Sequence, residues 1–255
     1  MNVLAFDCGN SRIKWGLHDG SGWAGTGVLP RAGLATLPAA LAHLPRPQRI
    51  AVSNVAGAAL RAELEAQFAP LGVKPQWLAA AASQCGVVNR YDNPASLGVD
   101  RWCAMVAARA IENGACVVVG AGTATTVDLL SASGEFLGGL ILPGYELMKR
   151  SLAQNTAGLP FADGRQVDMP RNTADAIESG VAHAQAGAVE RMHALLARQA
   201  GQVGRVACIV SGGAAPAVAR GLGVPHRVVE HLVLDGVVRI VSQADGQGHG
   251  IGGAA

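Results

Sequence analysis

The sequence predicts an α/β protein built from two similar domains in tandem. Two stretches far apart in the chain each contain short apolar runs separated by glycine-containing turns, a pattern typical of three-strand meanders. Alternating helical and strand patterns follow each meander. Half of the residues are hydrophobic and 34 are glycine, as expected of a packed α/β protein. A chain of 255 residues suits one large domain or two of about 110–130 residues.

The first meander opens the chain. We expect strands over 2–7, 12–18 and 23–29, joined by the turns CGNS and DGSG. The pattern then predicts a strand over 49–55 and a helix over 56–68 with Leu60, Leu64 and Phe68 on one face. A strand over 73–79 and a helix over 100–113 complete this half.

The second half repeats this order. We expect strands over 115–120, 125–130 and 135–142, a long helix over 174–199, a strand over 205–211, a loop and helix over 212–222, a strand over 226–230 and a last helix over 232–244. The predicted domains are therefore 1–113 and 114–245, followed by a flexible tail over 246–255.

The two meanders superpose at a constant offset without a gap. The matched identities are Gly9 with Gly122, Leu17 with Leu130, Gly25 with Gly138, Leu29 with Leu142 and Pro30 with Pro143. An internal repeat of this kind fixes the architecture. It predicts two facing domains with a cleft between them, to which each contributes a phosphate-sized turn.

Composition excludes several functional classes. The formal net charge is +2 and no basic run occurs, so a nucleic-acid partner is not expected. No apolar run approaches the roughly 18 residues of a membrane span, and the start lacks a basic leader. The five cysteines are scattered without a C-x-x-C pair, and the histidines show no metal-ligand spacing. We therefore expect a cytoplasmic protein.

The turn in NVLAFDCGNSRIKWGL has two interpretations. It is either an ordinary hairpin turn or a nest of backbone N–H groups that binds phosphate. In the second, Gly9 lets the phosphate approach, Asn10, Ser11 and Lys14 add donors and charge, and Asp7 holds Mg²⁺ largely through water. In the second repeat, Gly122 and Thr123 are the matching candidates.

Two further segments carry candidate residues. In YDNPASLGVDRW, Asp100 is either a carboxylate that complements a helix dipole or a general base, with Arg101 as an anion ligand and Tyr91 as core or cleft wall. In PRNTADAI, Asn172 or Thr173 caps the long helix. If the cap is the hydroxyl of Thr173, it can also face a cleft.

Together these segments resemble the type III pantothenate kinases of the acetate and sugar kinase/Hsp70/actin superfamily. The matching motifs are DCGNSRIKWGL, YDNPASLGVDRW, GTATTVD and NTADAI, in that order over about two-thirds of the chain. The resemblance implies two tandem ribonuclease H-like (actin-like) domains. It also implies ATP-dependent phosphorylation of pantothenate, with Mg²⁺, a monovalent cation (K⁺ or NH₄⁺) and a homodimer. The alternatives are another small-hydroxyl kinase, such as a sugar kinase, and a regulatory accessory protein without turnover.

The resemblance also assigns residues. ATP binding falls to Asp7, Cys8, Gly9, Asn10, Ser11, Arg12, Ile13, Lys14, Gly122 and Thr123. Pantothenate binding falls to Tyr91, Gly98, Val99, Asp100, Arg101 and Thr173. Asp100 is the implied proton acceptor, and Thr173 the implied contact from the partner subunit. Family members often carry an aspartate for the monovalent cation where this chain has Gly120, so a backbone carbonyl, water or a cationic group would have to substitute.

Overall fold

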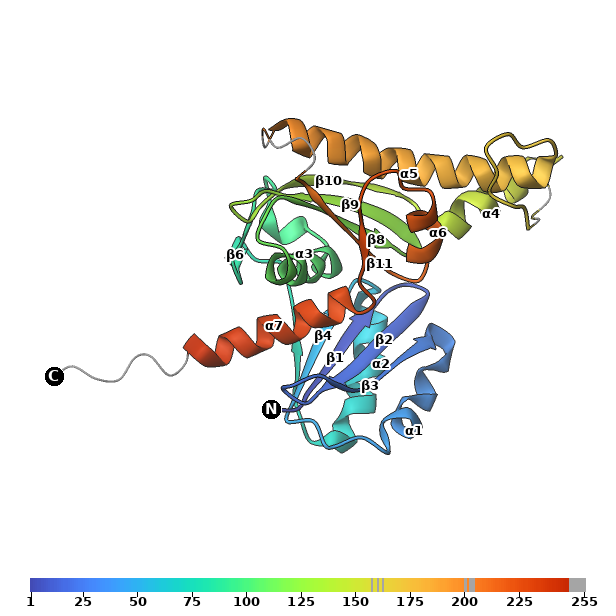
Figure 1. Ribbon diagram of the computed structural model, residues 1–255. Helices are drawn as coiled ribbons and strands as arrows, with labels where there is room; N and C mark the ends of the chain where they lie inside the picture. Colours follow the sequence, from blue (N-terminus) through green and yellow to red (C-terminus); the bar gives the residue numbers. More distant parts are fainter. Residues whose placement is uncertain (157, 160, 162, 200, 202–204, 248–255) are drawn as a thin grey trace. The chain divides into compact units, whose positions relative to one another are not determined.

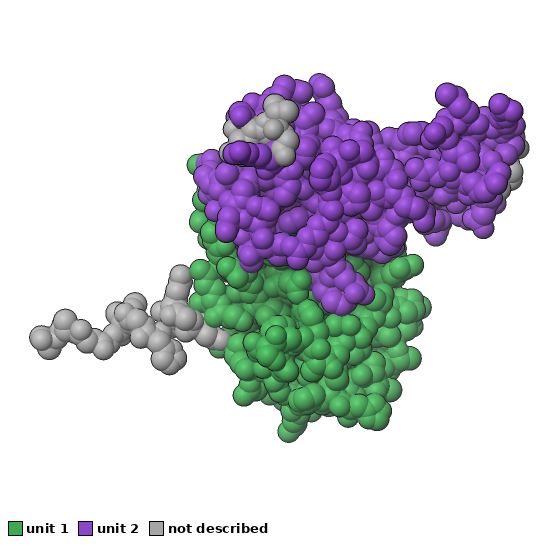
Figure 2. Space-filling view, in the orientation of Figure 1, with its two compact units in different colours: residues 1–107, 232–255 green, residues 108–231 purple. Residues whose placement is uncertain are grey.

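A computed structural model describes residues 1–156, 158, 159, 161, 163–199, 201 and 205–247 (Figure 1). The chain divides into two compact units (Figure 2). Unit 1 comprises Met1–Ala107 together with Leu232–Ala255, and unit 2 comprises Ala108–His231. Each unit is built on a mixed sheet, so the predicted α/β character is confirmed.

The sheet of unit 1 follows the predicted meander. Its strands are β1 (Val3–Cys8), β2 (Arg12–His18), β3 (Trp23–Pro30), β4 (Arg49–Asn54) and β5 (Pro75–Trp77), in the order β3-β2-β1-β4-β5. The strands β1, β2 and β3 pair antiparallel. The strand β4 runs parallel to β1, and β5 runs parallel to β4. The carboxyl ends of β1 and β4 therefore lie next to each other.

Alternation along β1 sends its side chains to two different faces. Leu4, Phe6 and Cys8 pack with the buried face of α2 (Gly57–Phe68), as the periodicity of that helix predicts. Val3, Ala5 and Asp7 point to the opposite face, where α7 (Leu232–Gln247) packs against β1, β2 and β4. A short helix α1 (Leu37–Leu41) and the 3₁₀ segments η1 (Arg31–Thr36) and η2 (Ala69–Leu71) complete the connections.

The segment before α3 (Val99–Ile111) contains small elements that the sequence pattern does not reveal. They are β6 (Ser83–Gln84), β7 (Val87–Asn89) and the 3₁₀ turn η3 (Pro94–Ser96). Cys85 and Gly86 both have positive φ, as a two-residue turn between antiparallel strands requires. The fully buried Trp102 anchors α3, and its indole N–H donates to Gln84 at 3.2 Å. A side chain at Gly236 would overlap the backbone oxygen of Cys103, so α7 packs closely on α3.

Unit 2 repeats the same strand order. Its strands β8 (Cys116–Ala121), β9 (Ala124–Leu130), β10 (Glu135–Pro143), β11 (Ala207–Ser211) and β12 (Arg227–Val228) follow the order β12-β11-β8-β9-β10. Its helices are α4 (Tyr145–Asn155), α5 (Thr173–Gln199) and α6 (Ala215–Arg220). The long helix α5 packs on β8 and β9 through buried residues that include Val181 and Val189.

Strand register confirms the internal repeat but corrects its alignment. Asp7 pairs with Lys14 across β1 and β2, whereas Gly120 pairs with Thr126 across β8 and β9. The second turn is therefore one residue shorter, and the ungapped superposition is wrong along β9. Both meanders carry a bulge between their second and third strands, and there Leu17 corresponds to Leu129 rather than Leu130. The shared bulge supports a common origin of the two meanders more strongly than the sequence identities do.

The division into units also differs from the predicted boundaries at 113 and 245. The final helix α7 belongs to unit 1, because its buried residues, including Leu234 and Val241, cover the free face of the first sheet. The predicted tail begins too early, since α7 continues to Gln247, and residues 248–255 lie outside the described part of the chain. Helix α4 was not predicted; it buries Tyr145 and Lys149, and Met148 packs against the core of unit 2.

Candidate active site

The turn after β1 is closed by backbone hydrogen bonds. The N–H of Gly9 donates to the oxygen of Arg12 at 3.1 Å, and the N–H of Arg31 donates to the oxygen of Ser11 at 3.2 Å. The turn of unit 2 keeps both bonds, from Gly122 to Ala124 and from Gly144 to Thr123. In this alignment Thr123 takes the place of Ser11. Each turn therefore pairs a glycine with a hydroxyl residue.

The fold itself does not require these glycines. Neither Gly9 nor Gly122 has a positive φ, and a Cβ on either would meet its nearest backbone oxygen at an ordinary 3.5 Å. Glycine is needed where a ligand approaches the backbone closely. The two turns therefore leave space above the backbone that the fold does not use.

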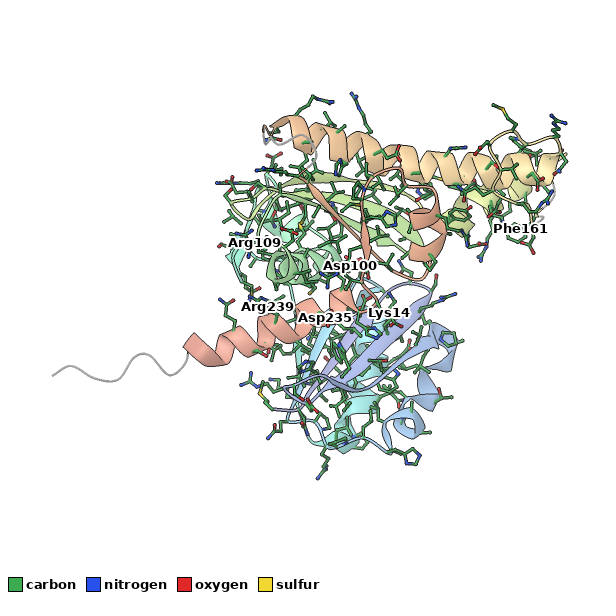
Figure 3. All side chains as sticks on the ribbon, viewed as in Figure 1. Lys14, Asp100, Arg109, Phe161, Asp235 and Arg239 are labelled. Carbon is green, nitrogen blue, oxygen red and sulfur yellow. The ribbon has the colours of Figure 1, made fainter. Side chains whose placement is uncertain are left out.

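An ion pair lies at the end of β1. Lys14 Nζ is 3.8 Å from Asp7 Oδ2, and the two side chains are 28% and 14% exposed. Burial raises the pKa of the Asp7 carboxyl to about 6, against the opposing charge of Lys14, and the charge of Asp100 raises it further. Asp100 therefore lies within electrostatic reach of Asp7, although the two are far apart in the sequence. Figure 3 labels Lys14 on β2 and Asp100 on α3.

Asp100 lies in the first turn of α3, where its charge complements the helix dipole. The oxygen of Gly98 accepts the N–H of Trp102 at 3.0 Å and so begins the helix. A Cβ at position 98 would come within 2.7 Å of Asp100 Oδ1. Glycine at this position therefore leaves room for the Asp100 carboxylate to fold back over the helix start.

Arg101 is nearly buried, with 6% of its surface exposed. Its guanidinium donates to the hydroxyl of Tyr91 at 2.9 Å and lies 5.6 Å from the centre of that ring. Asn89 holds the Tyr91 loop, since its side chain accepts the N–H of Tyr91 and donates to Pro94. This arrangement holds the guanidinium of Arg101 against the ring and hydroxyl of Tyr91, one residue after Asp100 in α3.

The predicted residues fall into two groups. Asp7 to Lys14, Tyr91 and Gly98 to Arg101 belong to unit 1, whereas Gly122, Thr123 and Thr173 belong to unit 2. Thr173 is an exposed residue in the first turn of α5, and the side chain of Asn172 caps the helix by accepting the N–H of Asp175. Ser53 on β4 pairs in register with Asp7 on β1. No sequence motif marked this serine.

Two other kinds of site, a nucleophilic cysteine and a metal centre with several protein ligands, find little support. All five cysteines are free and buried, and burial raises the pKa of Cys8 far from nucleophilic use. Within the described part of the chain, no three His, Cys, Asp or Glu side chains gather closely enough to hold a metal ion. A single carboxylate is nevertheless a fitting partner for Mg²⁺, which keeps several waters and takes ligands from substrate phosphates. Among the residues described, no helix has the length and apolarity needed to cross a bilayer.

Solved structures define the class of protein. MreB 5 of Spiroplasma citri bound to AMPPNP matches with a TM-score of 0.54 and 10% identity, over 97% of this chain and 98% of that one. A Campylobacter jejuni protein assigned to the Baf family of transcriptional activators matches with a TM-score of 0.57 and 23% identity, over 95% and 99%. At these identities the likeness concerns the fold alone. The chain has the actin-like fold of two tandem domains, as predicted.

Sequence comparison then identifies the family. The family model for type III pantothenate kinase matches residues 3–195. The type III pantothenate kinase of Aromatoleum aromaticum is 52% identical over 243 residues, covering 95% of this chain and 98% of that protein. That of Nitrosospira multiformis is 47% identical over 241 residues, covering 94% and 91%. The chain belongs to the type III pantothenate kinase family.

The raised pKa of Asp7 predicts a pH-dependent penalty on stability. Because its pKa rises from 3.8 to about 6 on folding, the stabilising contribution of this carboxyl is complete below about pH 4 and is lost as the pH rises through 6. Relative to Asp7→Asn, the wild type should lose up to roughly 3 kcal/mol between pH 4 and 7. Urea unfolding in EDTA measures this difference. The exposed Asp92→Asn is the matched control, and a pH-independent difference for Asp7→Asn would contradict the assignment.

Proposed function

We propose that the chain transfers the γ-phosphoryl group of ATP to the hydroxyl group of pantothenate, giving 4′-phosphopantothenate at the first step of coenzyme A biosynthesis. Family membership supports the reaction. The structural observation that carries the proposal is the ion pair of Lys14 with Asp7 on the strands that flank the glycine turn, 3.8 Å from Nζ to Oδ2. It places a positive charge and a carboxylate that can hold Mg²⁺ beside one turn.

The residues of the first turn bind the nucleotide phosphates in this proposal. Backbone N–H groups over Cys8–Ser11 supply hydrogen bonds, Lys14 supplies positive charge, and Gly9 leaves the approach open. Gly122 and Thr123 are the corresponding phosphate-binding residues of the turn in unit 2. Asp7 holds Mg²⁺, which neutralises charge on the phosphates when bound. Nucleotide binding by both turns explains why each keeps a glycine that the backbone does not need.

Pantothenate binds at the start of α3. Arg101 pairs with its carboxylate, while Tyr91, Gly98 and Val99 line the site. Asp100 accepts the proton of the substrate hydroxyl as that oxygen bonds to the γ-phosphorus. The bond from the γ-phosphorus to the bridging oxygen breaks, and ADP leaves. Positioning and charge neutralisation supply most of the rate enhancement in phosphoryl transfer.

The active enzyme is a homodimer in which Thr173 completes the site of the partner subunit. An apolar groove of about 880 Å³ runs along α4 and α5 and includes Thr173. Leu152 and Ile177 line this groove, and Leu147 on α4 is 44% exposed. Apolar grooves of this kind are typical of surfaces buried by association.

A cytoplasmic location agrees with five free cysteines, since disulfides are rare in that compartment.

Gly120 gives a monovalent cation no carboxylate ligand. Gly120 offers no side-chain oxygen, and its paired neighbours Thr126 and Ser211 carry neutral hydroxyls. Asp128 is buried two residues further along β9, where it pairs with Val118 rather than Gly120. We therefore infer that K⁺ or NH₄⁺ is held by neutral oxygens of the backbone and of water, which are common ligands of K⁺.

The general-base assignment predicts a large loss of turnover in Asp100→Asn. The rate of pantothenate-dependent ADP release should fall about 10²–10⁴-fold, while the thermal melting temperature stays near that of the wild type. Asp92→Asn, which changes an exposed carboxylate in the segment before α3, is the control. A panel of sugars and other small alcohols in the same assay tests the substrate. Near-full activity of Asp100→Asn, or a preference for another alcohol, would refute the proposal.

The shared site predicts complementation between two inactive variants. Asp100→Asn and Thr173→Arg should each be nearly inactive alone. Co-expressed in equal amounts, they should form mixed dimers with one intact site and recover about a quarter of the wild-type rate. If Thr173 served its own subunit, the mixture would show only the average of the two variants.

Neutral cation ligands at Gly120 predict an ADP release rate that falls when choline replaces K⁺ or NH₄⁺ at constant ionic strength. Gly120→Asp is the informative variant, because it adds a carboxylate at this position. Its Cβ would meet Thr126 Oγ1 at 2.8 Å, which a rotation of Thr126 relieves. A wild-type rate that is the same in choline would show that the chain turns over without a monovalent cation.

A further inference from the structure

Ser53 lies beside Asp7 at the carboxyl ends of two parallel strands. The two residues pair in register, and Ile50 and Val52 pack into the opposite face of the sheet with Leu4 and Phe6. Alternation therefore turns the Ser53 and Asp7 side chains to the same face. In open α/β sheets, ligands bind beyond the carboxyl ends of the strands.

The Ser53 hydroxyl has no structural use in the described fold. The residue is 0% exposed, and among the described residues its Oγ has no hydrogen-bond partner. Burial of an unsatisfied hydroxyl costs free energy that alanine would not. Ala51, two residues earlier on the same face, is equally buried without a polar atom. A serine at position 53 therefore needs a reason other than packing.

Asp7 supplies the acceptor within reach. In-register residues on neighbouring strands lie about 4.8 Å apart, and the serine hydroxyl can turn among three staggered rotamers. Lys14 on β2 approaches Asp7 Oδ2 from one side of β1, and Ser53 on β4 lies on the other side. A carboxylate accepts several hydrogen bonds at once, so both neighbours and a metal ion can share it.

We propose that Ser53 is a positioning residue for Asp7: its Oγ–H donates to the Asp7 carboxylate and fixes the oxygen that faces Mg²⁺. This inference rests on the proposed role of Asp7 as the metal-binding carboxylate. Metal-binding carboxylates are commonly oriented by such hydrogen bonds, and loss of the donor typically weakens metal affinity about 10–100-fold.

The test measures the affinity of the full chain for Mn²⁺ in the presence of ATP and the absence of pantothenate. The EPR signal of free Mn²⁺ reports how much of the metal ion is bound. Ser53→Ala should weaken Mn²⁺ affinity at least about 10-fold. Ser53→Cys, close in size but a weak donor, should behave alike. The KM for MgATP should rise with a smaller change in kcat, and the metal-free melting temperature should not fall. A purely structural role would lower stability and leave Mn²⁺ affinity unchanged.

The internal repeat offers a matched control. Ser211 has the same place in unit 2, in register with Gly120, where no carboxylate is present. Ser211→Ala should retain wild-type Mn²⁺ affinity. If Asp7→Asn loses Mn²⁺ while Ser53→Ala binds it as the wild type does, the inference about Ser53 is overturned and the role of Asp7 stands. If Asp7→Asn keeps wild-type affinity, the metal assignment in the proposed function fails as well.

Discussion

The register of β1 between β2 and β4 is the constraint on which the rest of unit 1 depends. Because alternate residues of β1 face opposite sides, Phe6 completes the core with α2 while Asp7 joins the face covered by α7. A shift by one residue would turn Asp7 into the core formed with α2 and turn Phe6 toward α7. The same register sets Lys14 and Ser53 on either side of the carboxylate. The two pairings of β1 thus fix both the packing of the core and the neighbours of Asp7.

The two meanders show how one scaffold can carry unequal chemistry. Where unit 1 has the charged pair Asp7 and Lys14, unit 2 has Gly120 and Thr126. The glycine and hydroxyl of the turn are kept in both, so the form of the turn and the charge beside it are separable features. Loss of one turn residue in unit 2 leaves the strands and their bulge intact. The turn can therefore change in length and sequence while the strand pairing of the sheet stays the same.

Local pattern allowed most of the fold to be predicted, since strands such as Arg12–His18 alternate clearly and end at glycine-containing turns. Helix α4 was missed although Tyr145, Met148 and Leu152 have helical spacing; what no local pattern reveals is its buried Lys149, which pairs with Glu178. The apolar face of α7 predicts a helix but carries no information about which sheet it covers. For the site, the glycine turn and the start of α3 were visible as motifs. Ser53 was not, because a single small residue at a strand end has no spacing or motif to mark it.

The membership of α7 in unit 1 has a consequence for biosynthesis of the chain. Unit 1 is discontinuous, so the face of β1 that carries Val3 and Ala5 waits for a helix made after all of unit 2. At about 5–20 residues per second, ribosomal synthesis leaves that face without its final cover for several seconds or more. Unit 2 is continuous and can close as soon as it emerges. A nascent chain would therefore complete its second unit before its first.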